Sequence, residues 1–440
     1  MKVKVVKFGG TSMADAKAIT QSAKIVLSDE SRRYVVVSAP GKRNSQDHKV
    51  TDLLYACYHD IEINGECKAT FDKIRVRFRE IVQDLGLDFD IEPYLDKAEE
   101  EMLKYRSSEF CASRGEYLSA VVFAKKLGYQ FVDAKDIFVF SDRGEFDAEA
   151  TNAKVGETLK NIERAVIPGF FGADENGNVH TFSRGGSDVS GAVIARAVGA
   201  SIYENWTDVS GFLTSDPRIV ENPAPIEILS YRELRELSYM GANVLHPESI
   251  FPVRISNIPI NIRNTFMPEA KGTMIVSQVP QERIKESSIT GIAGKKGYSI
   301  VFIEKSMMNS ELGFARRVLS VFEYYNVSFE HMPSGIDTLS IVVADSEIAG
   351  KEDVIVDRIQ KTVNPDHIEI KTGVSLIATV GHGISYNPGM AARLCSALAK
   401  SNINIKMIDQ GSSELNIIVA VATGDYENAI NAIYNEFKNR

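Results

Sequence analysis

Two patterns of apolar and polar residues alternate along the first half of the chain. Short runs rich in β-branched and apolar residues occupy 3–8, 34–40, 165–173 and 200–211, which is typical of buried strands. Between them apolar residues recur at helical spacing, as at Ala16, Ile19, Ala23 and Val26. Strands that alternate with helices predict an α/β domain with a mainly parallel sheet flanked by helices. Ligands of such sheets gather at the carboxyl ends of the strands.

The second half of the chain contains an internal repeat. It follows a polar segment at 266–286, which contains Pro268 and Pro280 and reads as a boundary. Residues 312–343 align without a gap on residues 388–419 at a constant offset (389 − 313 = 76 and 411 − 335 = 76). Such a gapless offset indicates two copies of one folding unit. Each copy has the order strand, helix, strand, strand, helix, which lacks one strand of a ferredoxin-like βαββαβ unit.

The missing strands indicate how the two copies are connected. "HIEIKTG" can complete the first copy, whereas the chain ends in a helix after the second, and 288–294 is the strand left over for it. We therefore expect the first unit to be inserted within the second. The predicted organisation is an α/β domain over 1–275, a linker over 276–287, a strand of the second unit over 288–294, the first unit over 295–372 and the second over 373–440.

Composition narrows the class of protein. A net charge of −9 argues against nucleic acid or an anionic membrane surface as the main partner. Four cysteines without a CxxC pair fit reduced thiols in a cytoplasmic protein, and seven histidines show no ligand spacing, so no protein-bound metal is expected. The sequence shows no signal-peptide pattern and no apolar run near the roughly 18 residues needed to span a membrane.

Candidate chemistry begins at "KFGGTS", directly after the first predicted strand. The chain has no GxxxxGK[ST] pattern, so this is not a P-loop of the Walker A type. Gly9 and Gly10 would let a ligand approach the backbone, while Thr11 and Ser12 would begin a helix whose free N–H groups favour an anion. With the charge of Lys7, these features predict a phosphate site. The alternative is a glycine turn with a lysine that reaches solvent.

"FSRGGSD" repeats this design. A strand leads into a glycine pair, and Ser187 and Asp188 would then cap a helix. Arg184 is suited to a bidentate contact with a carboxylate. Asp188 either positions Lys7 or acts as a helix cap and no more.

Three further stretches contain polar residues at expected strand or helix ends. "NWTDVSGFLTSDPR" has Thr207, Asp208 and Asp216, which either contact an adenine nucleotide or form a polar turn. "SRGEYLSA" places Glu116 in the first turn of an expected helix, as a partner for a substrate ammonium or as an N-terminal charge. His246 in "GANVLHPES" follows an apolar pair, which is more typical of packing than of catalysis.

Together these stretches resemble the aspartate kinases of the amino acid kinase superfamily. The motifs that carry the resemblance occur in the family's order: "KFGGTS", "VVVSA", "RGE", "SRGGSD", "WTDVSGFLTSDPR", "VLHP" and "NINIKMIDQGSSE". The resemblance implies an amino acid kinase fold followed by two ACT units, and no room for the homoserine dehydrogenase domain of some relatives. It also implies ATP-dependent phosphorylation of the β-carboxylate of L-aspartate to 4-phospho-L-aspartate, the first step toward lysine, threonine and methionine.

The resemblance also implies site residues. Lys7 would neutralise the transferring phosphoryl group, Asp188 would hold that lysine, and Mg²⁺ would arrive on the phosphates of ATP. The nucleotide contacts would be Lys7, Gly9, Gly10, Thr207, Asp208, Asp216 and Arg218. The aspartate contacts would be Ser38, Thr51, Glu116, Arg184 and Ser187. An effector amino acid, lysine or threonine or both, would contact Met308, Gly313, Ala315 and Glu330.

Two positions depart from the family, and other functions stay open. Asn243 replaces a lysine that reaches the ATP phosphates in many relatives, and the segment 39–54 is longer than usual, so it is either a lid or a solvated loop. The alternatives are a glutamate 5-kinase or N-acetylglutamate kinase, or an inactive amino acid sensor. Arg184 with Glu116 favours a free α-amino acid, and intact Lys7 and Asp188 argue against a sensor. The ACT pair would also make a homodimer or higher oligomer, with or without a ligand.

Overall fold

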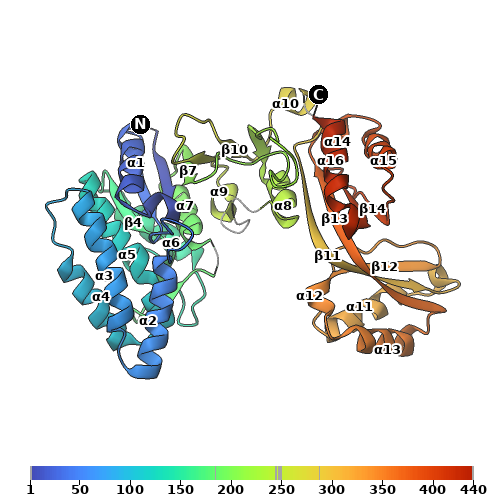
Figure 1. Ribbon diagram of the computed structural model, residues 1–440, viewed down its shortest axis with the longest axis horizontal. Coiled ribbons are helices and arrows are strands. Elements are labelled where there is room, and N and C mark those ends of the chain that lie inside the picture. The colour runs from blue at the N-terminus through green and yellow to red at the C-terminus, as the bar shows by residue number, and fades with distance from the viewer. Residues whose placement is uncertain (1, 184, 243–244, 246–249, 287, 439–440) are drawn as a thin grey trace. The chain divides into compact units, whose positions relative to one another are not determined.

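The computed structural model describes residues 2–183, 185–242, 245, 250–286 and 288–438. The chain forms two compact units (Figure 1). The first consists of Met1–Phe212, Pro225–Leu234 and Asn243–Val279, and the second of Leu213–Ala224, Arg235–Ala242 and Pro280–Arg440. Two short segments, 213–224 and 235–242, therefore belong to the second unit although residues of the first unit precede and follow each of them in the sequence. Within the described residues, no helix has both the length and the apolar character needed to cross a membrane.

The first unit is built on an eight-stranded sheet, in the order β3-β4-β2-β1-β7-β9-β10-β8. All neighbouring strands are parallel except β9 and β10. The strands are β1 (Lys4–Phe8), β2 (Arg32–Val37), β3 (Gln130–Phe131), β4 (Ala165–Pro168), β7 (Ile202–Thr207), β8 (Ile228–Ser230), β9 (Ile260–Asn264) and β10 (Thr273–Val276). The predicted mainly parallel sheet is confirmed, and β1 lies between β2 and β7 near its centre.

Helices flank this sheet. They are α1 (Ala16–Leu27), α2 (Val50–Asn64), α3 (Lys68–Asp84), α4 (Glu92–Tyr105), α5 (Ser108–Leu127), α6 (Ala148–Leu159), α7 (Gly186–Ala197) and α9 (Phe251–Ile255), and α8 (Tyr231–Tyr239) is divided between the two units. Helix α5 packs on β2 and β4, and α7 packs on β1, β2 and β7. Helices α2 to α5 pack against one another as a group (Figure 1). The helices that carry Glu116 and Asp188 thus both contact the central strands.

The apolar stretch at 165–173, expected to be one strand, is two. Strand β4 ends at Pro168, and β5 (Phe171–Ala173) leaves the sheet to pair antiparallel with β6 (Val179–Thr181). The break coincides with Phe170, which has a positive φ of 78°. A Cβ on Gly169 would lie 2.7 Å from the Cβ of Ser187, so the chain turns where only glycine fits against α7.

The second unit is built on a five-stranded sheet, in the order β12-β11-β13-β15-β14. Its strands are β11 (Gly291–Glu304), β12 (Thr338–Ala344), β13 (His367–Val380), β14 (Met407–Asp409) and β15 (Asn416–Ala422). Its helices are α10 (Gln281–Glu286), α11 (Phe314–Tyr324), α12 (Asp345–Ile348), α13 (Glu352–Val363), α14 (Gly383–Tyr386), α15 (Met390–Lys400) and α16 (Tyr426–Phe437). Two separate hydrophobic clusters, one around α11 and α13 and one around α15 and α16, form the cores of the two ferredoxin-like units.

The two long strands show how these two ferredoxin-like units are connected. The first part of β11 pairs with the last part of β13, as Gly291 with Val380 and Gly294 with Ile377. The last part of β11 pairs with the first part of β13, as Glu304 with His367. Each long strand therefore supplies one strand to each ferredoxin-like unit. This is the pairing that an insertion of the first unit within the second requires, and it agrees with the predicted fold class.

Candidate active site

The carboxyl ends of β1, β2, β4 and β7 lie next to one another in the first sheet. Lys7 pairs in register with Val36 on β2 and with Asn205 on β7. The chain then leaves β1 at Gly9, β2 at Ser38 and β7 at Asp208. The parallel sheet therefore brings together the ends of segments that are far apart in the sequence, as expected for the ligand-binding edge of an α/β fold.

Lys7 forms a buried ion pair with Asp188. The two side chains are joined by a 2.6 Å contact between Nζ and Oδ1, and Lys7 is only 8% exposed. The Asn205 side-chain amide donates to the same Asp188 oxygen at 2.9 Å, and the Tyr203 hydroxyl donates to the Asp188 backbone carbonyl at 3.1 Å. Asp188 is thereby fixed from β7, and it gives Lys7 a counter-ion in a defined direction.

Helix α7 begins differently from the sequence prediction. Its N-cap residue is Gly185, which has a φ of 60° and makes no side-chain cap bond. Ser187 and Asp188 were expected to cap this helix, and that expectation is wrong: they are its second and third residues. The Asp188 carboxylate is directed to Lys7 and Asn205 instead, which rules out the alternative that it is a helix cap and no more.

The glycine pair after β1 makes a close contact with the loop after β2. A Cβ on Gly10 would lie 3.1 Å from the Ala39 carbonyl oxygen and 3.3 Å from the Gly41 Cα. The Gly41 N–H donates to the Gly10 carbonyl at 2.8 Å. A Cβ on Gly9 would lie 3.6 Å from the Lys7 Nζ, so the absence of a side chain there keeps space open next to the ammonium. The loop residue Gly41 was missed by the sequence reasoning.

Thr11 and Ser12, expected to begin a helix, lie in a separate short helix before α1. Gly10–Met13 is a short 3₁₀ helix, and α1 begins only at Ala16, where the Asp15 carboxylate caps it by accepting from the Ala18 N–H at 2.8 Å. The buried Ser12 hydroxyl lies 2.7 Å from the Thr265 hydroxyl. The N-terminus of a long helix is therefore not what faces a ligand at this position.

Glu116 is a buried carboxylate with an unused oxygen. Helix α5 begins at Ser108, so Glu116 lies in its third turn and not in its first, and the alternative of an N-terminal charge is wrong. The side chain is 5% exposed, the Ala39 N–H hydrogen-bonds it, and its Oε2 has no partner among the described residues. Burial raises the pKa of Glu116 to about 8, against the lowering effects of that hydrogen bond and of the charges of Lys7 and Arg114.

The glycine before Glu116 explains how this carboxylate reaches the loop after β2. A Cβ on Gly115 would lie 2.6 Å from the Ala39 Cβ and 3.4 Å from a Val50 methyl group on α2. Any side chain there would push α5 away from the loop, so Gly115 permits the contact between Glu116 and Ala39. The glycine of the "RGE" motif is therefore required by the packing of α5 against this loop.

Three other predicted aspartate contacts lie directly after β2 and in the first turns of α2 and α7. Ser38 directly follows β2, and its N–H donates to the Phe8 carbonyl at 3.1 Å. Thr51 is the second residue of α2, and Ser187, which is buried, is the second residue of α7. Arg184 lies outside the described residues. Their contacts with a substrate stay predictions.

The predicted nucleotide contacts divide between the two units. Thr207 and Asp208 follow β7, where the Thr207 hydroxyl donates to the Asp208 carboxylate at 3.2 Å and the Asn264 amide donates to the Asp208 carbonyl at 3.2 Å. Asp216 and Arg218 belong to the second unit and form an exposed ion pair of 2.6 Å. Asn243 and His246 lie outside the described residues. Asn264, which is buried at the end of β9, was missed by the sequence reasoning.

The predicted effector contacts lie in the first ferredoxin-like unit. Met308, Gly313 and Ala315 lie where the chain leaves β11 and enters α11, and Gly313 is the N-cap residue of that helix. The Glu330 N–H donates to the backbone carbonyl of Val342 on β12 at 2.8 Å. The Glu330 side chain accepts a hydrogen bond from the Tyr239 hydroxyl, and its Oε2 is buried without a partner among the described residues. Contacts of these four residues with an effector stay predictions.

Comparison with known proteins places this geometry in a family. The model of the amino acid kinase family matches residues 2–264, more than half of the chain, and an ACT domain model matches residues 377–437. The chain is 35% identical to aspartokinase 3 of Bacillus subtilis, over 99% of its own length and 98% of the relative's. The chain belongs to the aspartokinases of the amino acid kinase family.

Solved aspartokinases share the fold over the whole chain. The aspartate kinase of Clostridium acetobutylicum is 49% identical, covers 100% of both chains and superposes with a TM-score of 0.91. Aspartokinase III of Escherichia coli, in complex with aspartate and ADP, is 25% identical with a TM-score of 0.75 over 100% of both chains. The same E. coli enzyme has been solved with lysine and aspartate, in a form described as the T-state. The amino acid kinase fold with ACT domains, expected from the sequence, is thus that of the aspartokinases.

Proposed function

We propose that this aspartokinase transfers the γ-phosphoryl group of ATP to the β-carboxylate of L-aspartate. A carboxylate oxygen attacks the γ-phosphorus, the bond to the ADP oxygen breaks, and the products are 4-phospho-L-aspartate and ADP. The observation that carries the proposal is the buried Lys7–Asp188 ion pair at the end of the central strand, within electrostatic reach of the buried Glu116. The relatives named above support aspartate as the acceptor.

Lys7 contributes positive charge where negative charge moves during the reaction. Its ammonium lies at the carboxyl end of β1, and the lack of a side chain at Gly9 leaves room for a phosphoryl group beside it. Fixed positive charge in a water-poor site is effective in phosphoryl transfer because it needs little reorganisation. Asp188 holds the ammonium in one place, and Asn205 holds Asp188.

Glu116 is proposed to bind the α-ammonium group of aspartate. One of its oxygens is engaged by the Ala39 N–H, and the other has no partner among the described residues. A substrate ammonium at the free oxygen would favour the ionised carboxylate, which burial disfavours in the free protein. Ser38, Thr51 and Ser187 would then complete the aspartate site, together with Arg184 for the α-carboxylate.

The nucleotide is proposed to extend from Lys7 toward the end of β7, where Thr207 and Asp208 offer polar groups. Among the described residues, no three His, Cys, Asp or Glu side chains form a group able to hold a metal ion. A Mg²⁺ ion that arrives on the phosphates of ATP needs no such group, and when bound it adds positive charge to those phosphates. Asp216 and Arg218 stay predicted nucleotide contacts.

The ACT units are proposed to bind an end-product amino acid that inhibits the enzyme. Lysine is the first candidate, because the E. coli relative has been solved with lysine and aspartate. Inhibition requires that the effector bind an inactive state more tightly than the active one. Threonine, alone or together with lysine, is the alternative. Assembly into a homodimer through the ACT units and a cytoplasmic location also stay predictions.

One assay tests the function. The purified chain is incubated with ATP, Mg²⁺ and either L-aspartate, L-glutamate or N-acetyl-L-glutamate, and ADP release is measured together with hydroxylamine trapping of the acyl phosphate. We expect turnover with aspartate far above that with the other two acceptors. Turnover only with glutamate or its N-acetyl derivative would transfer the chain to another amino acid kinase activity. No turnover with any acceptor would support an amino acid sensor.

A further inference from the structure

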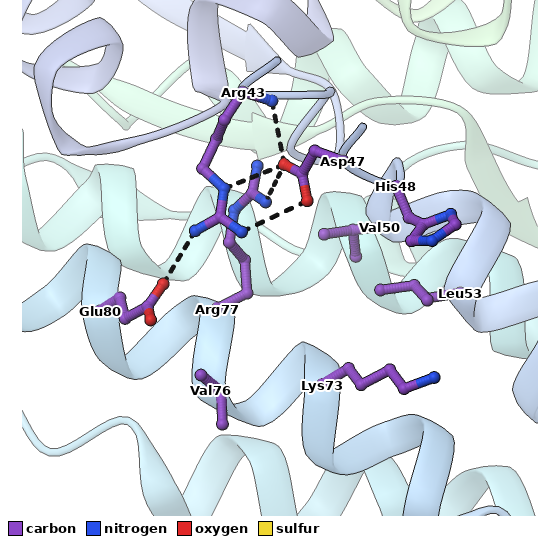
Figure 2. Close-up of a pocket in the computed structure, with 9 residues that line it drawn as sticks. All are labelled: Arg43, Asp47, His48, Val50, Leu53, Lys73, Val76, Arg77 and Glu80. Carbon is purple, nitrogen blue, oxygen red and sulfur yellow. Dashed lines mark hydrogen bonds and ion pairs between the residues drawn. The ribbon is translucent and has the colours of Figure 1, made fainter. Parts of the chain in front are cut away.

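Arg77 is a buried arginine whose guanidinium reaches the loops that border the candidate site. It lies on α3 and is only 5% exposed. Its Nε and Nη2 donate to the Ala14 carbonyl at 3.2 and 2.7 Å, and Nη2 also donates to the Gly41 carbonyl at 2.8 Å. Its Nη1 donates to the Asp47 carboxylate at 2.5 Å (Figure 2). Every nitrogen of the guanidinium therefore has an acceptor in the protein.

Two of these acceptors belong to the loops that meet at Gly10. Ala14 is the C-cap residue of the 3₁₀ helix that begins at Gly10, and Gly41 donates its N–H to the Gly10 carbonyl. A Cβ on Gly41 would lie 2.7 Å from the Gly10 carbonyl carbon, so the two backbones are in direct contact. Arg77 bonds to both loops at once. A displacement of either loop would leave part of a buried guanidinium without its acceptors, which is costly.

The same loop also holds Glu116. Ala39, two residues before Gly41, donates its N–H to the Glu116 carboxylate, and the Pro40 carbonyl accepts from the Val50 N–H at 3.1 Å. The position of residues 38–41 therefore sets the surroundings of both Gly10, next to Lys7, and Glu116. Arg77 is connected to both halves of the candidate site through one loop.

Ion pairs attach the remainder of this loop to α3. Asp47 pairs with Arg77 and with Arg43, whose backbone and side chain both donate to it, and Arg43 also pairs with Glu80 at 2.9 Å (Figure 2). Hydrogen bonds from Arg43, and then from Arg77, hold the pKa of Asp47 below its usual range although burial opposes this. The loop before α2, for which the sequence allows either a lid or a solvated segment, is thus bonded to α3 through Arg43 and Asp47.

We propose that Arg77 is a positioning residue for phosphoryl transfer, which holds the loops after β1 and β2 at the spacing that aligns Lys7 with the aspartate site. The proposal rests on the function proposed above. Each of the three guanidinium nitrogens of Arg77 is bonded to Ala14, Gly41 or Asp47, so we assign Arg77 no direct contact with a substrate. Its effect on the reaction passes through the two loops.

The test compares Arg77→Ala with a matched control on the same helix. Arg75 is also largely shielded, at 11% exposure of its side chain, but it pairs with Glu92, Asp96 and Glu99 of α4, away from the two loops. For each variant we would measure the thermal midpoint and folded fraction by circular dichroism, then kcat and both KM values. We expect Arg77→Ala to lower kcat about 100-fold at full folding, because small misplacements of reacting groups cost about that much. Arg75→Ala should lose stability but keep kcat within about threefold.

Rescue by guanidinium ion separates positioning from a general loss of structure. A cavity of about 200 Å³ lies beside Arg77 and gives a small cation access to the space left by the substitution. Millimolar guanidinium should restore at least about a tenth of the lost kcat in Arg77→Ala, because it can donate to the same carbonyls. It should have no effect on Arg75→Ala. Arg77→Lys should stay impaired, since one ammonium cannot bridge both loops and Asp47 in a planar arrangement.

Three results would overturn the proposal: wild-type kcat in folded Arg77→Ala, an equal loss in Arg75→Ala, or no response of Arg77→Ala to guanidinium. The wild-type chain is the separate test of the proposed function. If it phosphorylates glutamate or N-acetylglutamate in place of aspartate, the assignment of aspartate fails, and the Arg77 comparison is made with the acceptor that it uses. If it phosphorylates none of the three, both proposals fail.

Discussion

Glu116→Gln should change how the stability of the first unit depends on pH. In the folded chain burial raises the pKa of Glu116 from its ordinary 4.5 to about 8. Between these values the folded state keeps a proton that the unfolded state has lost, so the wild-type free energy of unfolding falls as the pH rises. The full difference, 8 − 4.5 = 3.5, corresponds to about 5 kcal/mol at about 1.36 kcal/mol per pH unit. A glutamine does not ionise, so the variant should lack this fall.

The measurement is urea unfolding at several pH values. Trp206 is the only tryptophan of the chain and is buried in the first unit, so its fluorescence follows the unit that contains Glu116. From about pH 5 to about pH 8, the unfolding free energy of Glu116→Gln minus that of the wild type should rise by about 4 kcal/mol, as an upper limit. Glu109→Gln removes a carboxylate from the same helix where the side chain is 42% exposed, and it is the matched control. A difference that stays constant with pH would refute the reasoning about Glu116.

Three other substitutions, one of them paired with a control, test further assignments. Lys7→Ala should lower kcat about 1,000-fold in a folded protein, while Lys4→Ala on the same strand should not, and near-normal kcat in folded Lys7→Ala would contradict its role. Asp188→Asn keeps a partner for Asn205 but removes the counter-ion of Lys7. The kcat measured by ADP release should therefore fall about 100-fold. An unchanged kcat would mean that the ion pair is not needed. Glu330→Ala should raise the lysine concentration needed for half-inhibition and leave uninhibited activity unchanged, and an unchanged inhibition curve would remove Glu330 from the effector site.

The fold was largely predictable because its signals are local and repeated. Alternating apolar runs and helical periods predicted the parallel sheet, and the 76-residue offset predicted two like units. The strand left over at 288–294 predicted that the first unit is inserted within the second, which agrees with the pairing of Gly291 with Val380. The assignment of 213–224 to the second unit was not predictable. It depends on contacts distant in sequence, such as the Ile292 N–H bonded to the Thr214 carbonyl and Val220 packed in a core of the second unit. A few apolar residues in a polar stretch, here Leu213, Ile219 and Val220, give no signal of this kind.

The local geometry of the candidate site was less predictable than the fold. Glu116 was expected in the first turn of a helix, but α5 begins eight residues earlier, at Ser108. The real cap is Ser107, whose hydroxyl accepts from the Phe110 N–H at 3.3 Å. A polar residue within a buried strand is a weak indication of a functional role, and Asn205 is such a residue. Nothing in the sequence indicated Gly41 or Arg77, because their roles depend on close backbone approach and on carbonyl groups of other segments.

The two glycines of "KFGGTS" are needed for different physical reasons. Gly9 leaves space beside the Lys7 ammonium, whereas Gly10 is required because the loop after β2 comes within hydrogen-bond distance of its backbone. A substitution at Gly10 would therefore disturb the loop that holds Glu116 before it disturbed a ligand at Lys7. If Lys7 contacts the phosphoryl group and Glu116 contacts aspartate, as proposed, the two halves of the site share a backbone contact. A fault in either loop should then affect both substrates. A variant such as Gly41→Ala, whose Cβ would meet Gly10, should for that reason change the KM of ATP and of aspartate together.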